Sequence, residues 1–244
     1  MIRSIIVENH IVYADDETFP GLFILQNGFN YEPHVRKELE RLLPSASAFL
    51  DVGANVGIHC VSAKSINPNL TVFAVEMLPN NVSMLCRTIE ENGFDDVNVI
   101  PVATAETHCI IRRNDDPCNG QPSFTQDGGF NNRTPAIPID FYRLPHVDVV
   151  KIDIEGFEYS AWQGMSRVLN DRPTIIFEFC PKHVHRSNTT PEAQLQWLFN
   201  LGYRLTVLEY TPGARRDFDS DPESILKHIK NTSGDITDIM ATKR

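Results

Sequence analysis

The stretch Ala48-Phe-Leu-Asp-Val-Gly-Ala-Asn-Val-Gly57 decides the fold of this 244-residue sequence. Its first half is an apolar run of strand length, and two glycines follow before a helical pattern that reaches Ile66. Glycines at this place let the backbone turn tightly into the helix and approach a ligand closely. Their spacing is G-x-x-x-G, whereas a dinucleotide-binding enzyme uses G-x-G-x-x-G to seat a pyrophosphate on the helix N-terminus.

Outward from this stretch, short apolar segments alternate with amphipathic ones. The pattern predicts further strands at 70–75, 97–100, 147–154, 174–179 and 203–209, and helices at 33–43, 79–92, 158–169 and 191–201. This alternation predicts a mostly parallel sheet with helices on both faces. Ligands of such sheets bind beyond the carboxyl ends of the strands, so the residues just after each strand are the candidates for a site.

The length predicts a single domain over residues 1–244. Within it we expect an N-terminal lid or cap over 1–45, a core that binds the ligand over 46–210, and a C-terminal helix and edge strand over 211–244. Residues 2–25 of the cap are expected to form a small antiparallel element. Residues 112–135 are polar and lack an apolar period, which predicts a substrate-side loop or a plain surface insertion.

The composition narrows the classes of partner. The formal net charge is −10, which argues against nucleic acid, because phosphate contacts supply most of the affinity of nucleic-acid binders. Five cysteines without a CxxC pair fit reduced thiols, and no stretch has the apolar length of a transmembrane helix. We therefore expect a cytoplasmic protein that binds a small molecule rather than nucleic acid or a membrane.

Glu76 closes the second expected strand, 25 residues after Asp51. A carboxylate at this point can accept hydrogen bonds from both hydroxyls of a ribose. An unmodified ribose suits an adenosine cofactor such as S-adenosylmethionine, and Asp51 would then face its positively charged amino acid part, directly or through water. Glu76 could instead be an exposed charge at a strand end, but the glycine turn favours the ribose interpretation.

A second charged motif is Val150-Lys-Ile-Asp-Ile-Glu-Gly-Phe-Glu158. Its charged residues alternate with isoleucine in a strand otherwise suited to burial, and a buried charge is costly unless it is paired or functional. At the carboxyl end of a central strand, Asp153 and Glu155 should point toward the cleft. The alternative is that either residue only caps the next helix.

These motifs resemble the FkbM-type methyltransferases, a branch of the class I S-adenosylmethionine-dependent enzymes. The resemblance spans residues 28–210 and rests on Tyr31-Glu-Pro33, Phe49-Leu-Asp-Val-Gly-Ala-Asn-Val-Gly57, Val75-Glu-Met-Leu-Pro-Asn80 and Asp148-Val-Val-Lys-Ile-Asp-Ile-Glu-Gly-Phe-Glu158, extended by Trp162-Gln-Gly164 and Phe177-Glu-Phe179. It implies a doubly wound, Rossmann-like sheet of seven strands, mostly parallel with an antiparallel edge strand. It also implies methyl transfer, most often to a hydroxyl of a sugar or natural product.

The resemblance also implies cofactor-binding residues by position. The methionine part would lie against Asp51, Gly53, Ala54, Asn55 and Gly57. Glu76 would bind the ribose and Met77 would flank the adenine. Val102, Ala103 and Asp153 would lie near the cofactor as well.

Methylation of an alcohol requires an aligned nucleophile and a group that accepts its proton. The candidates follow the fourth and fifth expected strands: Asp153, Glu155, Glu178, His183 and His185. Asp153 ranks first because the pattern defines its place best, with Glu178 and His183 next. A metal is not favoured, because no Asp-Asn pair follows Glu178.

Other functions stay open beside an O-methyltransferase for a small hydroxylated molecule. An N- or carboxyl-methyltransferase of peptide natural-product biosynthesis would need a weaker base. A cofactor-binding protein without catalysis is opposed by the intact glycines, Glu76 and Asp153. A nucleotide-dependent oxidoreductase is opposed by the glycine spacing.

Overall fold

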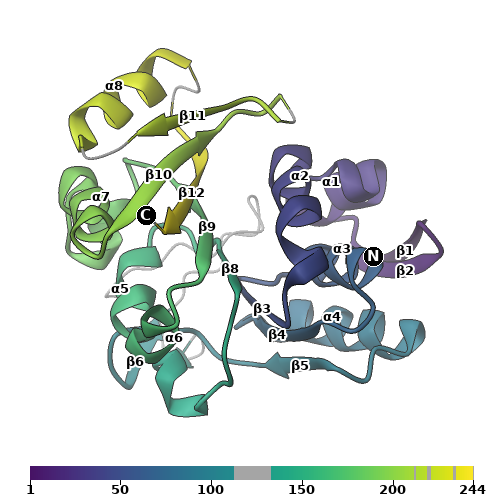
Figure 1. The fold of residues 1–244 in the computed structure, drawn as a ribbon. Coiled ribbons are helices and arrows are strands. Elements are labelled where there is room, and N and C mark those ends of the chain that lie inside the picture. Colours follow the sequence, from purple (N-terminus) through teal and green to yellow (C-terminus); the bar gives the residue numbers. More distant parts are fainter. Residues whose placement is uncertain (113–132, 212, 219–220, 233–234, 244) are drawn as a thin grey trace.

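The computed structural model describes residues 1–112, 133–211, 213–218, 221–232 and 235–243. At its centre is an eight-stranded sheet in the order β11-β10-β12-β9-β8-β3-β4-β5 (Figure 1). The parallel strands are β3 (Ala48–Val52), β4 (Thr71–Val75), β5 (Val97–Ile100), β8 (Val149–Ile152) and β9 (Thr174–Phe179). The predicted α/β class and the mostly parallel sheet with an antiparallel edge strand are confirmed.

The antiparallel part differs from the prediction in one respect. The C-terminal strand β12 (Thr237–Lys243) pairs with both β9 and β10 (Tyr203–Leu208), so it lies inside the sheet and not at the edge. The edge strand is β11 (Arg215–Phe218), which raises the number of strands from the expected seven to eight. The side chains explain this order, because Ile239 and Ala241 are fully buried whereas the arginines of β11 are exposed.

Helices cover both faces of the sheet (Figure 1). One face packs against α2 (Pro33–Leu42), α3 (Ile58–Ile66) and α4 (Pro79–Asn92), and the other against α5 (Glu158–Gln163), α6 (Ser166–Asn170), α7 (Pro191–Asn200) and α8 (Pro222–Thr232). Successive side chains of a strand point to opposite faces of the sheet, so the neighbouring residues Phe49 and Leu50 belong to different hydrophobic cores. The helix predicted over 158–169 is interrupted at Gly164, where a Cβ would lie 2.1 Å from the Ala105 carbonyl oxygen.

The N-terminal segment begins with the predicted antiparallel pair, β1 (Ile2–Val7) and β2 (His10–Asp15). The apolar run Leu22–Leu25 is not part of this pair but lies in helix α1 (Phe19–Asn27). A helix forms there because the Thr18 hydroxyl caps it by accepting from the Gly21 N–H at 3.2 Å, and Pro20 suits the first turn. Ile24 then packs with β2, α3 and α4 in a third core.

The expected substrate-side loop lies mostly outside the described residues, which stop at 112 and resume at 133. Its flanks pair as an antiparallel ladder of β6 (Cys109–Arg112) and β7 (Arg133–Ala136). Short 3-10 turns complete the chain at Gly28–Asn30, Leu43–Ser45, Ile139–Tyr142 and Val184–Ser187. In the part of the chain that the structure describes, no helix has the length and apolar character to cross a membrane.

Candidate active site

A cavity of about 520 Å³ lies at the carboxyl ends of the parallel strands, where doubly wound sheets bind their ligands. The ends of β3, β4, β5 and β8 contribute to its wall together with the N-terminal segment. The predicted cofactor and catalytic residues that line it are Gly53, Ala54, Asn55, Glu76, Met77, Val102, Ala103, Asp153, Glu155 and Glu178.

The glycine turn brings backbone to the cavity wall. Gly53 has a φ of +87° and packs so closely on the next strand that a Cβ would lie 1.9 Å from the Asp153 carbonyl oxygen. The N–H groups of Gly53 and Ala54 both donate to the Val75 carbonyl, at 2.9 Å each. No side chain fits at Gly53, so the end of β3 meets the end of β8 through bare backbone.

Glu76 lies at the end of β4 and is only 6% exposed. Its Oε2 accepts from the Asn55 N–H at 2.9 Å and its Oε1 accepts from the Leu78 N–H at 2.7 Å. Burial raises the pKa of Glu76 to about 6 against the opposing effect of these N–H groups. Each carboxylate oxygen keeps a second lone pair, which is what a ribose with two hydroxyls requires.

Asp51 and Gly57 do not lie in the cavity wall, in contrast to the prediction that both cradle the cofactor. Asp51 is fully buried, and its Oδ2 accepts from the Cys60 thiol of α3 at 3.4 Å. Its Oδ1 has no hydrogen-bond partner among the described residues, and burial raises its pKa. Gly57 has a φ of +91° and allows close packing of Leu85. Both residues therefore shape the turn from behind.

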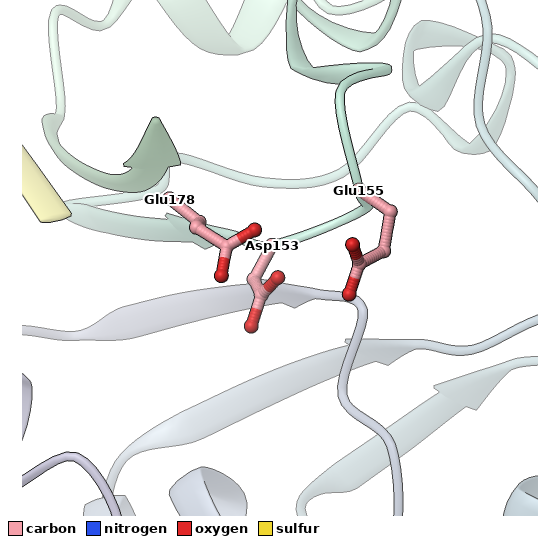
Figure 2. Close-up of side chains that lie close together, drawn as sticks. All are labelled: Asp153, Glu155 and Glu178. Atoms are coloured by element: carbon pink, nitrogen blue, oxygen red, sulfur yellow. The ribbon is translucent and has the colours of Figure 1, made fainter. Parts of the chain in front are cut away.

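Three carboxylates gather beside the turn, and Figure 2 shows Asp153, Glu155 and Glu178 facing a common space. One oxygen of each lies within 4.8 Å of the others. Burial, followed by the charge of Asp153, raises the pKa of Glu155 to about 7. Burial, followed by the charges of Asp153 and Glu155, raises the pKa of Glu178 to about 11. The spacing is also one that a divalent cation could bridge, although the sequence prediction includes no metal.

The backbone around Glu155 is held by its neighbours. Glu155 has a φ of +60°, a conformation that side chains other than Gly, Asn and Asp rarely adopt. The buried Glu158 Oε1 accepts from the N–H groups of Ile154 and Gly156, at 3.1 Å each. Arg186 donates to the Glu155 carbonyl at 2.6 Å. These bonds fix the turn that presents the Glu155 carboxylate to the cavity.

The two candidate histidines lie outside the cavity wall. His183 Nδ1 is 3.8 Å from Glu155 Oε2, and burial lowers the pKa of its imidazole. His185 is exposed and its Nδ1 lies 2.7 Å from the Lys182 carbonyl oxygen. Any part played by His183 would therefore run through Glu155.

Three ionisable residues of the site were not among the predicted site residues: Glu32, His59 and Lys151. The Lys151 ammonium lies 3.2 Å from Asp153 Oδ2 and 3.8 Å from Glu32 Oε2. The same Glu32 oxygen is 2.8 Å from His59 Nε2. Lys151 is 2% exposed, and a lysine inside an apolar strand is a signal in the sequence that buried carboxylates surround it.

Comparison with known proteins identifies the family. The sequence matches the family model of the methyltransferase FkbM domain over residues 51–205. The chain belongs to the FkbM methyltransferase family. It is thus an S-adenosylmethionine-dependent methyltransferase, as the motifs predicted, and the residues at the cavity fit that cofactor. No curated protein matches the sequence significantly.

Solved structures share the FkbM enzyme's fold at low sequence identity. The FkbM methyltransferase from Methylobacillus flagellatus KT aligns with a TM-score of 0.52 and 17% identity, over 93% of this chain and 55% of that chain. Fibrillarin from Aeropyrum pernix, solved in complex with natively bound S-adenosyl-L-methionine, aligns with a TM-score of 0.51 and 11% identity, over 99% and 82%. These likenesses show the fold alone, so the acceptor must be argued from the site.

Proposed function

We propose that this FkbM enzyme transfers a methyl group to a hydroxyl oxygen of a sugar or another small natural product, with Glu155 as the proton acceptor. S-Adenosylmethionine supplies a methyl group already activated by its sulfonium. The observation that carries the proposal is the placement of Glu155 in the cavity wall with its pKa raised to about 7. A general base works best when its pKa lies near the operating pH.

The other two carboxylates are less suited to accept the proton. With a pKa of about 11, Glu178 is protonated at neutral pH and donates a hydrogen bond rather than accepting a proton. Asp153 Oδ2 is engaged by the Lys151 ammonium at 3.2 Å. We therefore rank Glu155 above Asp153, Glu178 and His183, and assign Asp153 and Glu178 to the orientation of the acceptor.

The cofactor residues follow from the same wall. Glu76 would bind the two ribose hydroxyls, and the hydrogen bonds that its carboxylate accepts from the Asn55 and Leu78 N–H groups hold it in place. The turn at Gly53, Ala54 and Asn55 would lie against the methionine part, because Gly53 has no side chain to obstruct the approach of a ligand. Met77 would flank the adenine, and Val102, Ala103 and Asp153, which line the same cavity, would lie near the cofactor as well.

The remaining wall suits a molecule with several hydroxyls. Its polar side chains include Glu106, Ser160, Gln163 and Asn188. Tyr159 adds an aromatic ring that is anchored edge-on against Trp162 and Trp197. Polar groups that fix orientation around an apolar surface are the usual design of a small-molecule site.

A methyl-transfer screen with isotope-labelled cofactor tests the proposal. The panel contains sugars and hydroxylated natural products, matched amines and matched carboxylic acids, and products are read by mass spectrometry. We expect label in an ether, which survives mild alkali, and transfer that is slower by about 100- to 10,000-fold in Glu155→Gln. Label found in an amine or in an alkali-labile ester would contradict O-methylation.

A further inference from the structure

The N-terminal segment contributes Glu32 to the cavity wall, together with Pro20, Ile24 and Tyr31. Glu32 sits directly before Pro33, the first residue of α2, with φ 48° and ψ 60°. Left-handed backbone is rare for a glutamate, and a following proline restricts the preceding residue to extended conformations. A conformation of this kind is strained and persists only where the surroundings hold it.

Two contacts on the carboxylate hold Glu32 there. His59 Nε2 lies 2.8 Å from Glu32 Oε2 and belongs to α3, the helix that follows the cofactor turn. Lys151 Nζ lies 3.8 Å from the same oxygen and belongs to β8, the strand that carries Asp153. One glutamate thus joins the N-terminal segment to both halves of the site.

The electrostatic interactions at these contacts are strong because the groups are shielded from water. Burial acts to raise the pKa of Glu32, but Lys151 and His59 outweigh it and bring the pKa down to about 2. Burial acts to lower the pKa of Lys151, but Asp153, Glu32 and Asp51 raise it well above its usual value. Removing one partner of such a buried pair leaves the other uncompensated.

We propose that Glu32 is a positioning residue for methyl transfer, which shares the Lys151 ammonium with Asp153 and so fixes the Asp153 carboxylate in the cavity. The contact with His59 ties the same glutamate to the helix behind the cofactor turn. Glu32 acts through Lys151. This inference rests on the proposed function for the part that Asp153 plays in turnover.

Loss of the Glu32 charge should therefore impair turnover rather than cofactor binding. Without the negative charge of Glu32, the buried ammonium is drawn toward Asp153 and the carboxylates beyond it, and the acceptor is misplaced. A small misplacement at a reacting centre costs up to about 100-fold in rate. The ribose carboxylate Glu76 and the glycine turn are untouched.

The test compares Glu32→Gln with Glu40→Gln, a matched change on α2. Glutamine keeps an oxygen for His59 but removes the charge facing Lys151. Glu40 is 38% exposed and pairs with Arg36 and Lys37 at the surface, where such pairs contribute little. We expect Glu32→Gln to lower kcat by about 10- to 100-fold, to change the Kd of S-adenosylhomocysteine less than about threefold and to leave Tm close to wild type, whereas Glu40→Gln behaves as wild type throughout.

A double-variant cycle tests whether Glu32 acts through Lys151. In a Lys151→Met background, Glu32→Gln should cause no further loss of kcat. An additional loss of the size seen in the wild-type background would overturn the proposal, as would a wild-type kcat for Glu32→Gln. A rise in the Kd and a fall in Tm that account for the whole loss of activity would show a purely structural role and overturn it too.

A spectroscopic readout separates this proposal from the proposed function. In protein labelled with nitrogen-15 at the lysine side chains, the Lys151 ammonium signal, assigned by its loss in Lys151→Met, should shift in Glu32→Gln and stay in place in Glu40→Gln. This measurement needs no acceptor, so it stands if the methyl-transfer screen contradicts O-methylation. If Lys151→Met does not fold, Lys151→Arg supplies the assignment. An unchanged signal in Glu32→Gln would overturn the proposal.

Discussion

Glu155 and Glu178, on neighbouring strand ends, bring carboxylate oxygens within 4.8 Å of one another. Two buried carboxylates at this spacing cannot both be ionised at low cost. The pKa of Glu155 accordingly rises to about 7 and that of Glu178 to about 11, with burial as the largest cause and the charge of Asp153 next. Burial beside Asp153 thus leaves Glu155 able to accept a proton near neutral pH, whereas Glu178 keeps its proton.

The pH dependence of turnover should follow Glu155. A base works only when ionised, so kcat should rise with pH through an apparent pKa of about 7 and level off above it. Glu155→Gln should lower kcat by about 100- to 10,000-fold, the usual contribution of general base catalysis. Steady-state kinetics from pH 5 to 9 on both proteins measures this. A Glu155→Gln enzyme with substantial activity and the same acidic limb would exclude Glu155 as the base.

Glu178→Gln should stabilise the protein, and more so at high pH. The folded-state pKa of about 11 lies above the ordinary value of 4.5, so the folded state binds more protons than the unfolded state between these values. The stability of the wild type therefore falls as pH rises through this window, whereas a glutamine has no proton to lose. We expect Tm of Glu178→Gln to exceed that of the wild type by about 2–4 °C at pH 9, equivalent to about 1 kcal/mol, with a smaller difference at pH 5. Equal differences at both pH values would argue against a protonated Glu178.

Turnover should not depend on a divalent cation. If Asp153, Glu155 and Glu178 share protons as their pKa values indicate, chelation by EDTA and addition of magnesium should each change kcat by less than about twofold. Metal analysis of the purified enzyme accompanies the kinetics. Loss of activity on chelation, restored by a divalent ion, would turn the three carboxylates from proton carriers into metal ligands.

Positions in the cavity wall that follow from a local strand pattern could be predicted from the sequence, whereas contacts made only by tertiary packing could not. Glu76, Gly53 and Asp153 each follow an apolar strand, and the edge to which such strands converge is a general property of parallel sheets. Glu32 and Lys151 meet from positions 119 residues apart, a contact that no local pattern contains. Side chains alternate between the two faces of a strand, and the Asp51 side chain lies on the face of Cys60, behind the turn, rather than in the cavity.

The order of the last strands also depends on tertiary packing that the local sequence does not show. A C-terminal edge strand was expected within 211–244, but the sequence pattern does not encode which neighbours a strand inserts between. In the fold, Thr237–Lys243 pairs on both sides, with Phe179 opposite Thr237 and Lys243 opposite Tyr203. The polar segment Arg215–Phe218 gave no apolar signal, and it forms the exposed edge.

The ribose contact of Glu76 is the central claim, and calorimetric titration with S-adenosylhomocysteine tests it most directly. We expect Glu76→Gln to weaken binding by about 10- to 100-fold, or about 1.4–2.7 kcal/mol, because charge-assisted hydrogen bonds are lost. Glu91→Gln, a matched change at an exposed position of α4, should bind as the wild type does. A Kd for Glu76→Gln equal to that of Glu91→Gln would contradict the assignment of the cavity as the cofactor site.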